Sequence, residues 1–201
     1  MIVYPEDNVN RLDIIDDAIK NHYGVQFKNM FPEVPSWDSF IAHMNLSYVK
    51  KIPHESDMYL HQAGEVFFWN YLNIQVDNAH KYFTEYAKVV SKLGEIHPFK
   101  KINSAFSMLS LTNHEPSAIG KHYDDIDIFS WQCKGKAIWY IGDDNIQKFE
   151  MEPGDIVFCP AWTTHEVVSV TPRAAISSYV VTGREDPKKR EDYKKNVKIN
   201  Q

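Results

Sequence analysis

The chain has 201 residues, of which 43% are hydrophobic, and a formal net charge of −5. This length and composition fit one domain with an apolar core. The net negative charge argues against a nucleic-acid backbone as the main partner, although a chain with this net charge can still contain a local basic groove. The N-terminus is acidic where a secretory signal is basic, and no apolar run reaches membrane-spanning length. We therefore expect a soluble, cytoplasmic protein with no membrane partner.

The first hundred residues are predicted to be helical. The apolar positions of residues 10–19 recur at helical spacing, and Ser36 suits the N-cap of a second helix that continues to Met44. Residues 56–93 contain no proline and repeat aromatic and aliphatic side chains at helical spacing. We expect them to form a long helix that ends at Gly94.

From Ile102 onward the sequence changes to short runs of β-branched and aromatic residues separated by turn signals, which is typical of an all-β sandwich or barrel. The runs expected to form strands are 104–111, 122–129, 131–133, 137–141, 146–151, 155–159, 165–170 and 174–181. This pattern divides the chain into a helical portion (1–100), a β core (101–183) and a charged tail (184–201), all within one compact domain. Cys133 and Cys159 lie in strand-like apolar runs, which favours reduced core thiols over a disulfide or a zinc site.

A candidate metal site comes from three residues of the β half. His122 and Asp124 are two positions apart in an extended segment, so period-two geometry directs both side chains to one face. His165 follows a Pro-Gly-Asp turn further along the chain. Two histidines and one carboxylate on one face of a metal leave the opposite positions open, as in non-haem Fe(II) oxygenases. Asp125 replaces Asp124 as ligand only if the strand register differs.

Residues 118–181 resemble the cupin-like and JmjC-type Fe(II)/2-oxoglutarate hydroxylases. The resemblance rests on the His-x-Asp pair, the run FSWQCKGK at 129–136, the Pro-Gly-Asp turn and His165. Residues 165–176 resemble equally the prolyl hydroxylase branch of the same superfamily. The resemblance implies an α+β architecture, in which the helical N-terminal half packs on a double-stranded β-helix (cupin or jelly-roll) barrel. It also implies that His122, Asp124 and His165 bind Fe(II) and that 2-oxoglutarate chelates the metal.

The distal carboxylate of 2-oxoglutarate then needs a cation. JmjC-type and asparaginyl hydroxylases use a lysine on the strand after the Gln-x-x-Gly run, but the matching position here is Ala137, and the lysine is one residue earlier at Lys136. A shift of one residue turns a strand side chain to the other face, so Lys136 should point away unless a bulge intervenes. Arg173 matches the prolyl hydroxylase position and is the favoured anchor, since its guanidinium binds a carboxylate with two hydrogen bonds. Tyr140 is a candidate hydroxyl partner, or an ordinary packing residue of the barrel.

The expected function is that of a dioxygenase, specifically a hydroxylase, which uses O₂ and 2-oxoglutarate to oxidise a protein side chain or a small molecule and releases succinate and CO₂. The loop 113–121, which contains His114, is a candidate gate. Trp131, Trp139 and Trp162 either line the pocket mouth or pack in the core.

Two rival functions stay open. One is a cupin metalloenzyme, a dioxygenase or isomerase, that does not use 2-oxoglutarate; such enzymes more often have a second histidine at the position of Asp124. The other is a non-catalytic binding module, which would be expected to have a damaged triad.

Overall fold

The computed structural model describes residues 1–45, 50–51, 58–61, 64–69, 73–96, 101–111 and 120–181. Its helices are α1 (Arg11–Asn21), α2 (Trp37–Asn45), α3 (Ala79–Tyr82) and α4 (Glu85–Ile96). Its strands are β1 (Ile2–Val3), β2 (Val25–Phe27), β3 (Lys50–Lys51), β4 (Met58–His61), β5 (Gly64–Trp69), β6 (Asn73–Asp77), β7 (Lys101–Ser110), β8 (Asp127–Lys134), β9 (Ala137–Ile141), β10 (Gln147–Met151), β11 (Ile156–Cys159), β12 (His165–Ser169) and β13 (Arg173–Val181). The tail 184–201 and His114 lie outside the described residues.

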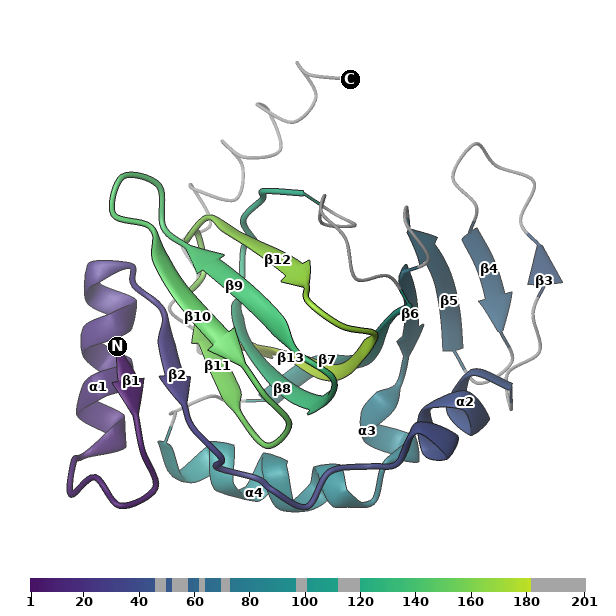
Figure 1. Ribbon diagram of the computed structural model, residues 1–201, viewed down its shortest axis with the longest axis horizontal. Helices are drawn as coiled ribbons and strands as arrows, with labels where there is room; N and C mark the ends of the chain where they lie inside the picture. Colours follow the sequence, from purple (N-terminus) through teal and green to yellow (C-terminus); the bar gives the residue numbers. More distant parts are fainter. Residues whose placement is uncertain are drawn as a thin grey trace.

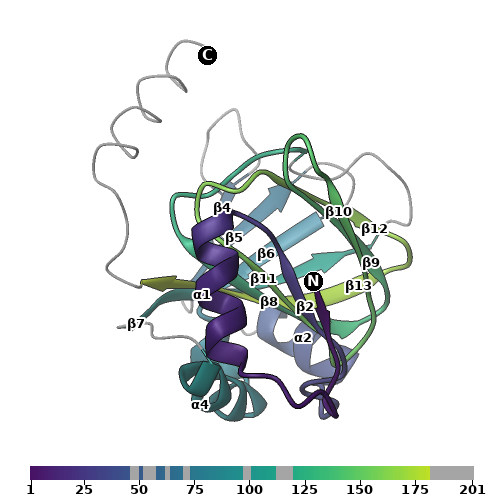
Figure 2. The same cartoon turned by 90° about the vertical axis from the view of Figure 1, so that its left-hand side faces the viewer.

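The strands of the described residues form two sheets that face each other (Figure 1). The large sheet has the order β1-β2-β11-β8-β13-β7-β6-β5-β4-β3, and the small sheet has the order β10-β9-β12. Figure 2 shows α2 and α4 on the side of the large sheet that faces away from the small sheet. No helix in the described part of the chain is both long and apolar enough to cross a membrane.

Side chains of the central strands alternate between two cores. In β8, Phe129 and Trp131 belong to the larger cluster, which includes buried residues of the helices, such as Phe40 and Leu93. Ile128 belongs to a smaller cluster with apolar residues of β9, β10 and β11. The inner faces of β7, β8 and β13 therefore look toward the small sheet, and this is the space in which the candidate site lies.

The first two predicted helices are confirmed, and their local sequence explains where they begin. The side chain of Asn10 accepts a hydrogen bond from the backbone N–H of Leu12 at 3.1 Å, and α1 begins at Arg11, directly after Asn10. The Ser36 hydroxyl accepts from the backbone N–H of Ser39 at 3.1 Å, and α2 begins at Trp37. Both are N-caps of the kind that satisfies the free N–H groups of a first helical turn.

The predicted helix over 56–93 is wrong in its first half. Residues 58–77 contain the strands β4, β5 and β6, and the helical part is confined to α3 and α4, which runs past Gly94 to Ile96. Short apolar runs rich in aromatic residues suit a buried strand as well as a helix. In the structure β4, β5 and β6 pair antiparallel with their chain neighbours, and β6 also pairs antiparallel with β7 beyond the intervening helices. The N-terminal half is thus mixed rather than helical.

The predicted strands of the β half are confirmed in place, with one rearrangement. A single strand, β8, replaces the two expected over 122–129 and 131–133. Ser130, where a break was expected, lies inside the sheet and pairs with Ser177 of β13. Before β8, His122 forms only an isolated bridge with His165.

Asp155 of the Pro-Gly-Asp turn fixes the start of β11. Its buried carboxylate accepts hydrogen bonds from Lys28 Nζ at 2.6 Å, the Asn29 N–H at 2.8 Å, the Glu152 N–H at 2.9 Å and Gln26 Nε2 at 3.0 Å. These four donors satisfy a charge that is costly to bury alone. They tie β2 to the turn that leads through β11 to His165.

Candidate metal centre and its cavity

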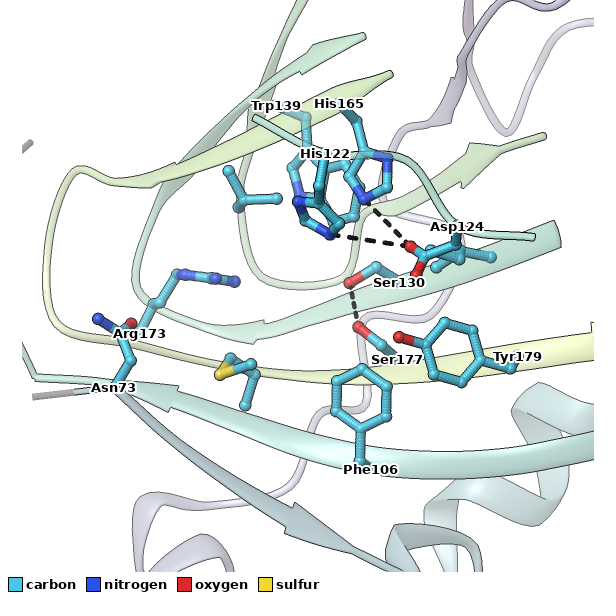
Figure 3. Close-up of a pocket in the computed structure, with 13 residues that line it drawn as sticks. Asn73, Phe106, His122, Asp124, Ser130, Trp139, His165, Arg173, Ser177 and Tyr179 are labelled. Carbon is cyan, nitrogen blue, oxygen red and sulfur yellow. Dashed lines mark hydrogen bonds and ion pairs between the residues drawn. The ribbon is translucent and has the colours of Figure 1, made fainter. Parts of the chain in front are cut away.

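Three candidate ligands converge in the space between the sheets (Figure 3). Asp124 Oδ2 lies 3.8 Å from Nε2 of His122 and 3.5 Å from Nε2 of His165. The ligand atoms of the three residues all lie within 4.8 Å of one another. The structure thus brings together the triad that the sequence predicts, and it groups Asp124 rather than Asp125 with the histidines.

The hydrogen bonds of the two imidazoles indicate which kind of ligand the three residues can bind. His122 Nδ1 lies 2.9 Å from the carbonyl oxygen of Gly120, and His165 Nδ1 lies 3.2 Å from the carbonyl oxygen of Thr163. A carbonyl only accepts, so each Nδ1 carries the proton and each Nε2 presents a lone pair to Asp124. Asp124 Oδ2 is itself buried and has no hydrogen-bond partner among the described residues. Three acceptors that face one another without a donor fit a cation.

Burial affects the ionisation of two of these ligands. It lowers the pKa of His165 to about 4, with His122 acting in the same direction, so His165 is neutral at physiological pH. Trp139 contributes to this burial by stacking on the His165 ring, with centroids 5.4 Å apart. Burial also raises the pKa of Asp124, an effect that nearby His122 opposes. A neutral imidazole is the form that binds a metal.

The main chain holds the ligands in place. The His122 N–H donates to the carbonyl of His165 at 2.9 Å, and the His165 N–H donates to the carbonyl of His122 at 2.6 Å. The Trp162 N–H donates to the carbonyl of Asp124 at 2.8 Å. The extended segment predicted for His122 and Asp124 is therefore reduced to one bridge, but both side chains still point to the same place.

A cavity extends from the triad across the inner face of the large sheet. It is lined by Asn73, Phe106, Met108, His122, Asp124, Ile128, Ser130, Trp139, His165, Val167, Arg173, Ser177 and Tyr179. The inner faces of β7, β8 and β13 form the floor of the cavity. Arg173 lies toward one end of this floor and Tyr179 toward the other, and the triad lies above the floor between them (Figure 3).

Arg173 brings a buried positive charge to this cavity. It is 6% exposed, and its Nε donates to the Ser169 hydroxyl at 3.1 Å. In the described part of the chain no carboxylate forms an ion pair with it. Burial lowers the pKa of Arg173 to about 10, so the guanidinium is still charged at neutral pH. Asn73 lies close by, because Asn73 and Arg173 both pair with Ser110, from opposite sides of β7.

The other candidates for co-substrate contacts lie outside the cavity. Lys136 is exposed and its Nζ lies 2.6 Å from Glu152 Oε1, which agrees with the expectation that it points away. Tyr140 is not among the residues that line the cavity. Buried and partly exposed residues alternate along β9, so Trp139 faces the cavity and Tyr140 faces the opposite side.

The three tryptophans lie in different surroundings. Trp131 is buried in the larger core, where its Nε1 donates to the carbonyl of Phe31 at 3.2 Å. Trp139 lines the cavity, whereas Trp162 lies against Tyr123, with ring centroids 5.8 Å apart.

Sequence reasoning missed four polar lining residues. Ser177 and Tyr179 lie on the same face of β13 as Arg173. Counting every second residue from Arg173 would have indicated that they also face the cavity. Ser130 was placed at a strand break, and Asn73 lay within the predicted long helix. Neither position gave a local signal that it would reach the cavity.

Comparisons with known proteins agree with this geometry. The JmjC domain family profile matches residues 88–150, a segment that includes His122 and Asp124. The solved structure of YcfD, a ribosomal oxygenase from Escherichia coli, in complex with cobalt and 2-oxoglutarate is similar over 83% of this chain and 51% of that chain, with a TM-score of 0.56 and 19% identity. The chain has the fold of the JmjC-type, cupin-like oxygenases.

A second YcfD structure, with cobalt and succinic acid, gives the same coverage, identity and TM-score. A third structure of this ribosomal oxygenase is 20% identical, with a TM-score of 0.55, and the similarity covers 82% of this chain and 50% of that chain. This JmjC-like chain therefore spans about half the length of the solved structures that it matches. No curated protein matches it.

Proposed function

We propose that the protein is an Fe(II)- and 2-oxoglutarate-dependent oxygenase that hydroxylates its substrate, with His122, Asp124 and His165 as iron ligands. One observation carries the proposal: a triad of facing acceptors and an unpaired buried guanidinium, Arg173, share a single cavity. The first fits a divalent cation and the second fits a carboxylate. A ligand that chelates a metal at one end and has a carboxylate at the other matches both.

The distal carboxylate of 2-oxoglutarate is assigned to Arg173. A buried unpaired charge costs several kcal/mol, about the cost that a bound carboxylate would relieve. Asn73 borders the same end of the cavity and is 4% exposed, so its amide lies within the polar part of the wall. A metal cupin that does not use 2-oxoglutarate has no need of this buried cation, which is why the oxygenase is favoured.

Bound iron and 2-oxoglutarate would supply the power to oxidise a C–H bond with O₂, with release of succinate and CO₂. The protein's own residues hold the metal, orient the keto acid and limit water. Phe106, Met108 and Ile128 make much of the floor apolar. The Tyr179 end lies away from Arg173 and is left for the substrate, which we propose to be a protein side chain or a small molecule.

The comparisons support this proposal. The family profile that matches is the JmjC domain, and YcfD has been solved with cobalt and 2-oxoglutarate. The strand order β7-β13-β8-β11, opposite β12-β9-β10 with His122 bridged to β12, also supports a double-stranded β-helix. We propose that residues 1–183 form one domain around it, since β6 of the N-terminal part continues the same sheet as β7.

Anaerobic titration tests the function. Purified protein with one equivalent of Fe(II) should develop a visible metal-to-ligand band as 2-oxoglutarate is added, and should form succinate when O₂ is admitted. His122→Ala should show neither. If the wild-type protein develops no band at millimolar 2-oxoglutarate yet binds Fe(II), the co-substrate assignment is refuted and a metal cupin that acts without 2-oxoglutarate replaces it.

A further inference from the structure

Two serine hydroxyls meet on the floor of the cavity. Ser130 of β8 and Ser177 of β13 are directly paired in the sheet, and their Oγ atoms are 2.9 Å apart. Both side chains line the cavity, although the residues are only 3% and 7% exposed. We call these two residues the serine pair.

The serine pair has a hydrogen-bond donor to spare. Each hydroxyl has one O–H, and the bond between them uses only one of the two. Among the described residues neither hydroxyl has another hydrogen-bond partner. When Ser177 donates to Ser130, the O–H of Ser130 is free to point into the cavity. A buried donor without an acceptor is unfavourable, so a ligand atom that accepts this bond binds more tightly.

The position of the pair identifies which part of a ligand it meets. Figure 3 draws the Ser130 hydroxyl below His122, between Arg173 and Tyr179, and Asp124 lines the same cavity. The neighbouring floor residues, Met108 and Phe106, offer no hydrogen bond to an oxygen. A ligand that extends from Arg173 to the metal ligands therefore brings its metal-binding end to Ser130.

We propose that the serine pair is a second positioning site for the co-substrate, in which Ser130 donates a hydrogen bond to the keto-acid end of 2-oxoglutarate and Ser177 orients Ser130. The inference rests on the proposed function and adds two residues to it. The pair fixes the chelating end, whereas Arg173 fixes the distal carboxylate. The two contacts are therefore made to different ends of one molecule.

A purely structural role is the alternative, because the same hydrogen bond also links β8 to β13. Ser178 provides a matched control. It is the next residue of β13, is 1% exposed, and forms a hydrogen bond with Tyr86 on the opposite face of the sheet. Ser178→Ala removes a buried serine hydroxyl from the same strand without changing the cavity.

The test is calorimetric titration of 2-oxoglutarate into the Mn(II)-loaded protein. Ser130→Ala should weaken 2-oxoglutarate binding about tenfold or more, the effect of losing a hydrogen bond to a charged group, with Mn(II) affinity unchanged. Ser177→Ala should weaken it less, and Ser178→Ala should leave it as in the wild type. In the double variant with Arg173→Met the two fold-losses should multiply, since the contacts are independent. In the Fe(II) protein, Ser130→Ala should also shift the visible band.

Several results would overturn the inference. If Ser130→Ala lowers thermal stability but leaves 2-oxoglutarate affinity within twofold of the wild type, the pair is only a structural link, and the proposed function stands. If Ser130→Ala loses Mn(II), the pair serves the metal ligands instead. Should Ser130→Ala not fold, an unchanged affinity in Ser177→Ala refutes the inference equally. Failure of the wild-type protein to bind 2-oxoglutarate refutes the inference and the function together.

Discussion

Replacing Arg173 with methionine should make the ligand-free protein more stable and its binding of 2-oxoglutarate weaker. Burial lowers the pKa of Arg173 to about 10, a change that corresponds to a cost of about 3 kcal/mol for the charged form. Methionine removes this cost but also the hydrogen bond to Ser169, which contributes about 1 kcal/mol. A net gain of about 2 kcal/mol should raise the melting temperature by roughly 4–8 °C for a chain of this size.

The effect on binding should have the opposite sign. Loss of one partner of a buried charge pair weakens binding by about 2–5 kcal/mol, so the dissociation constant for 2-oxoglutarate should rise by a factor of about 30 to 5000. Calorimetry on the Mn(II)-loaded protein measures this change, and thermal unfolding without ligand measures the stability. Lys136→Ala is the control, because its exposed ion pair with Glu152 lies outside the cavity. An Arg173→Met protein that melts lower and binds 2-oxoglutarate as the wild type does would refute this reasoning.

Three further predictions concern the metal, a turn and the thiols. Asp124→Ala should lose the single Fe(II) or Mn(II) that the wild type binds, whereas Asp125→Ala should keep it; equilibrium dialysis decides, and stoichiometric metal in Asp124→Ala contradicts the site. Gly135→Ala should destabilise the fold by about 1–3 kcal/mol in urea unfolding, because Gly135 has φ +64° and a Cβ there would meet the Pro172 carbonyl oxygen; an unchanged midpoint would show that the turn adapts. Mass spectrometry without reductant should find free thiols at Cys133 and Cys159, which are both buried and unpaired with each other; a Cys133–Cys159 bond would contradict the structure.

The candidate metal triad could be predicted from the sequence because its residue types and spacing form a local pattern. His122 and Asp124 are two residues apart, and His165 follows a recognisable turn, so each residue carries its own signal. Strand alternation predicted that Lys136 points away, and the resemblance to the prolyl hydroxylases indicated Arg173, which lines the cavity. The same alternation, counted from Trp139, places Tyr140 on the outer side of β9, away from the cavity.

What could not be predicted depends on contacts between distant segments. The apolar run before α3 fits a helix or a strand equally well by spacing, and only its pairing with β5 and β7 identifies it as a strand. Asn73 reaches the cavity only through that pairing. Ser130 and Ser177 belong to no sequence motif. The hydrogen bond of a serine inside a strand depends on which residue lies opposite it in the sheet, and the sequence does not show this.

The reciprocal backbone hydrogen bonds between His122 and His165 bear on how the proposed site would take up a metal. Because main-chain atoms hold the two histidines side by side, binding of a metal at the proposed site should require little reorganisation. The free energy of coordination is then not consumed in folding the chain, as it is in a zinc finger. It appears instead as added stability that grows with free metal, by about 4 kcal/mol when the metal is a thousandfold above its dissociation constant. If the protein is the proposed oxygenase, iron should therefore exchange while the fold persists.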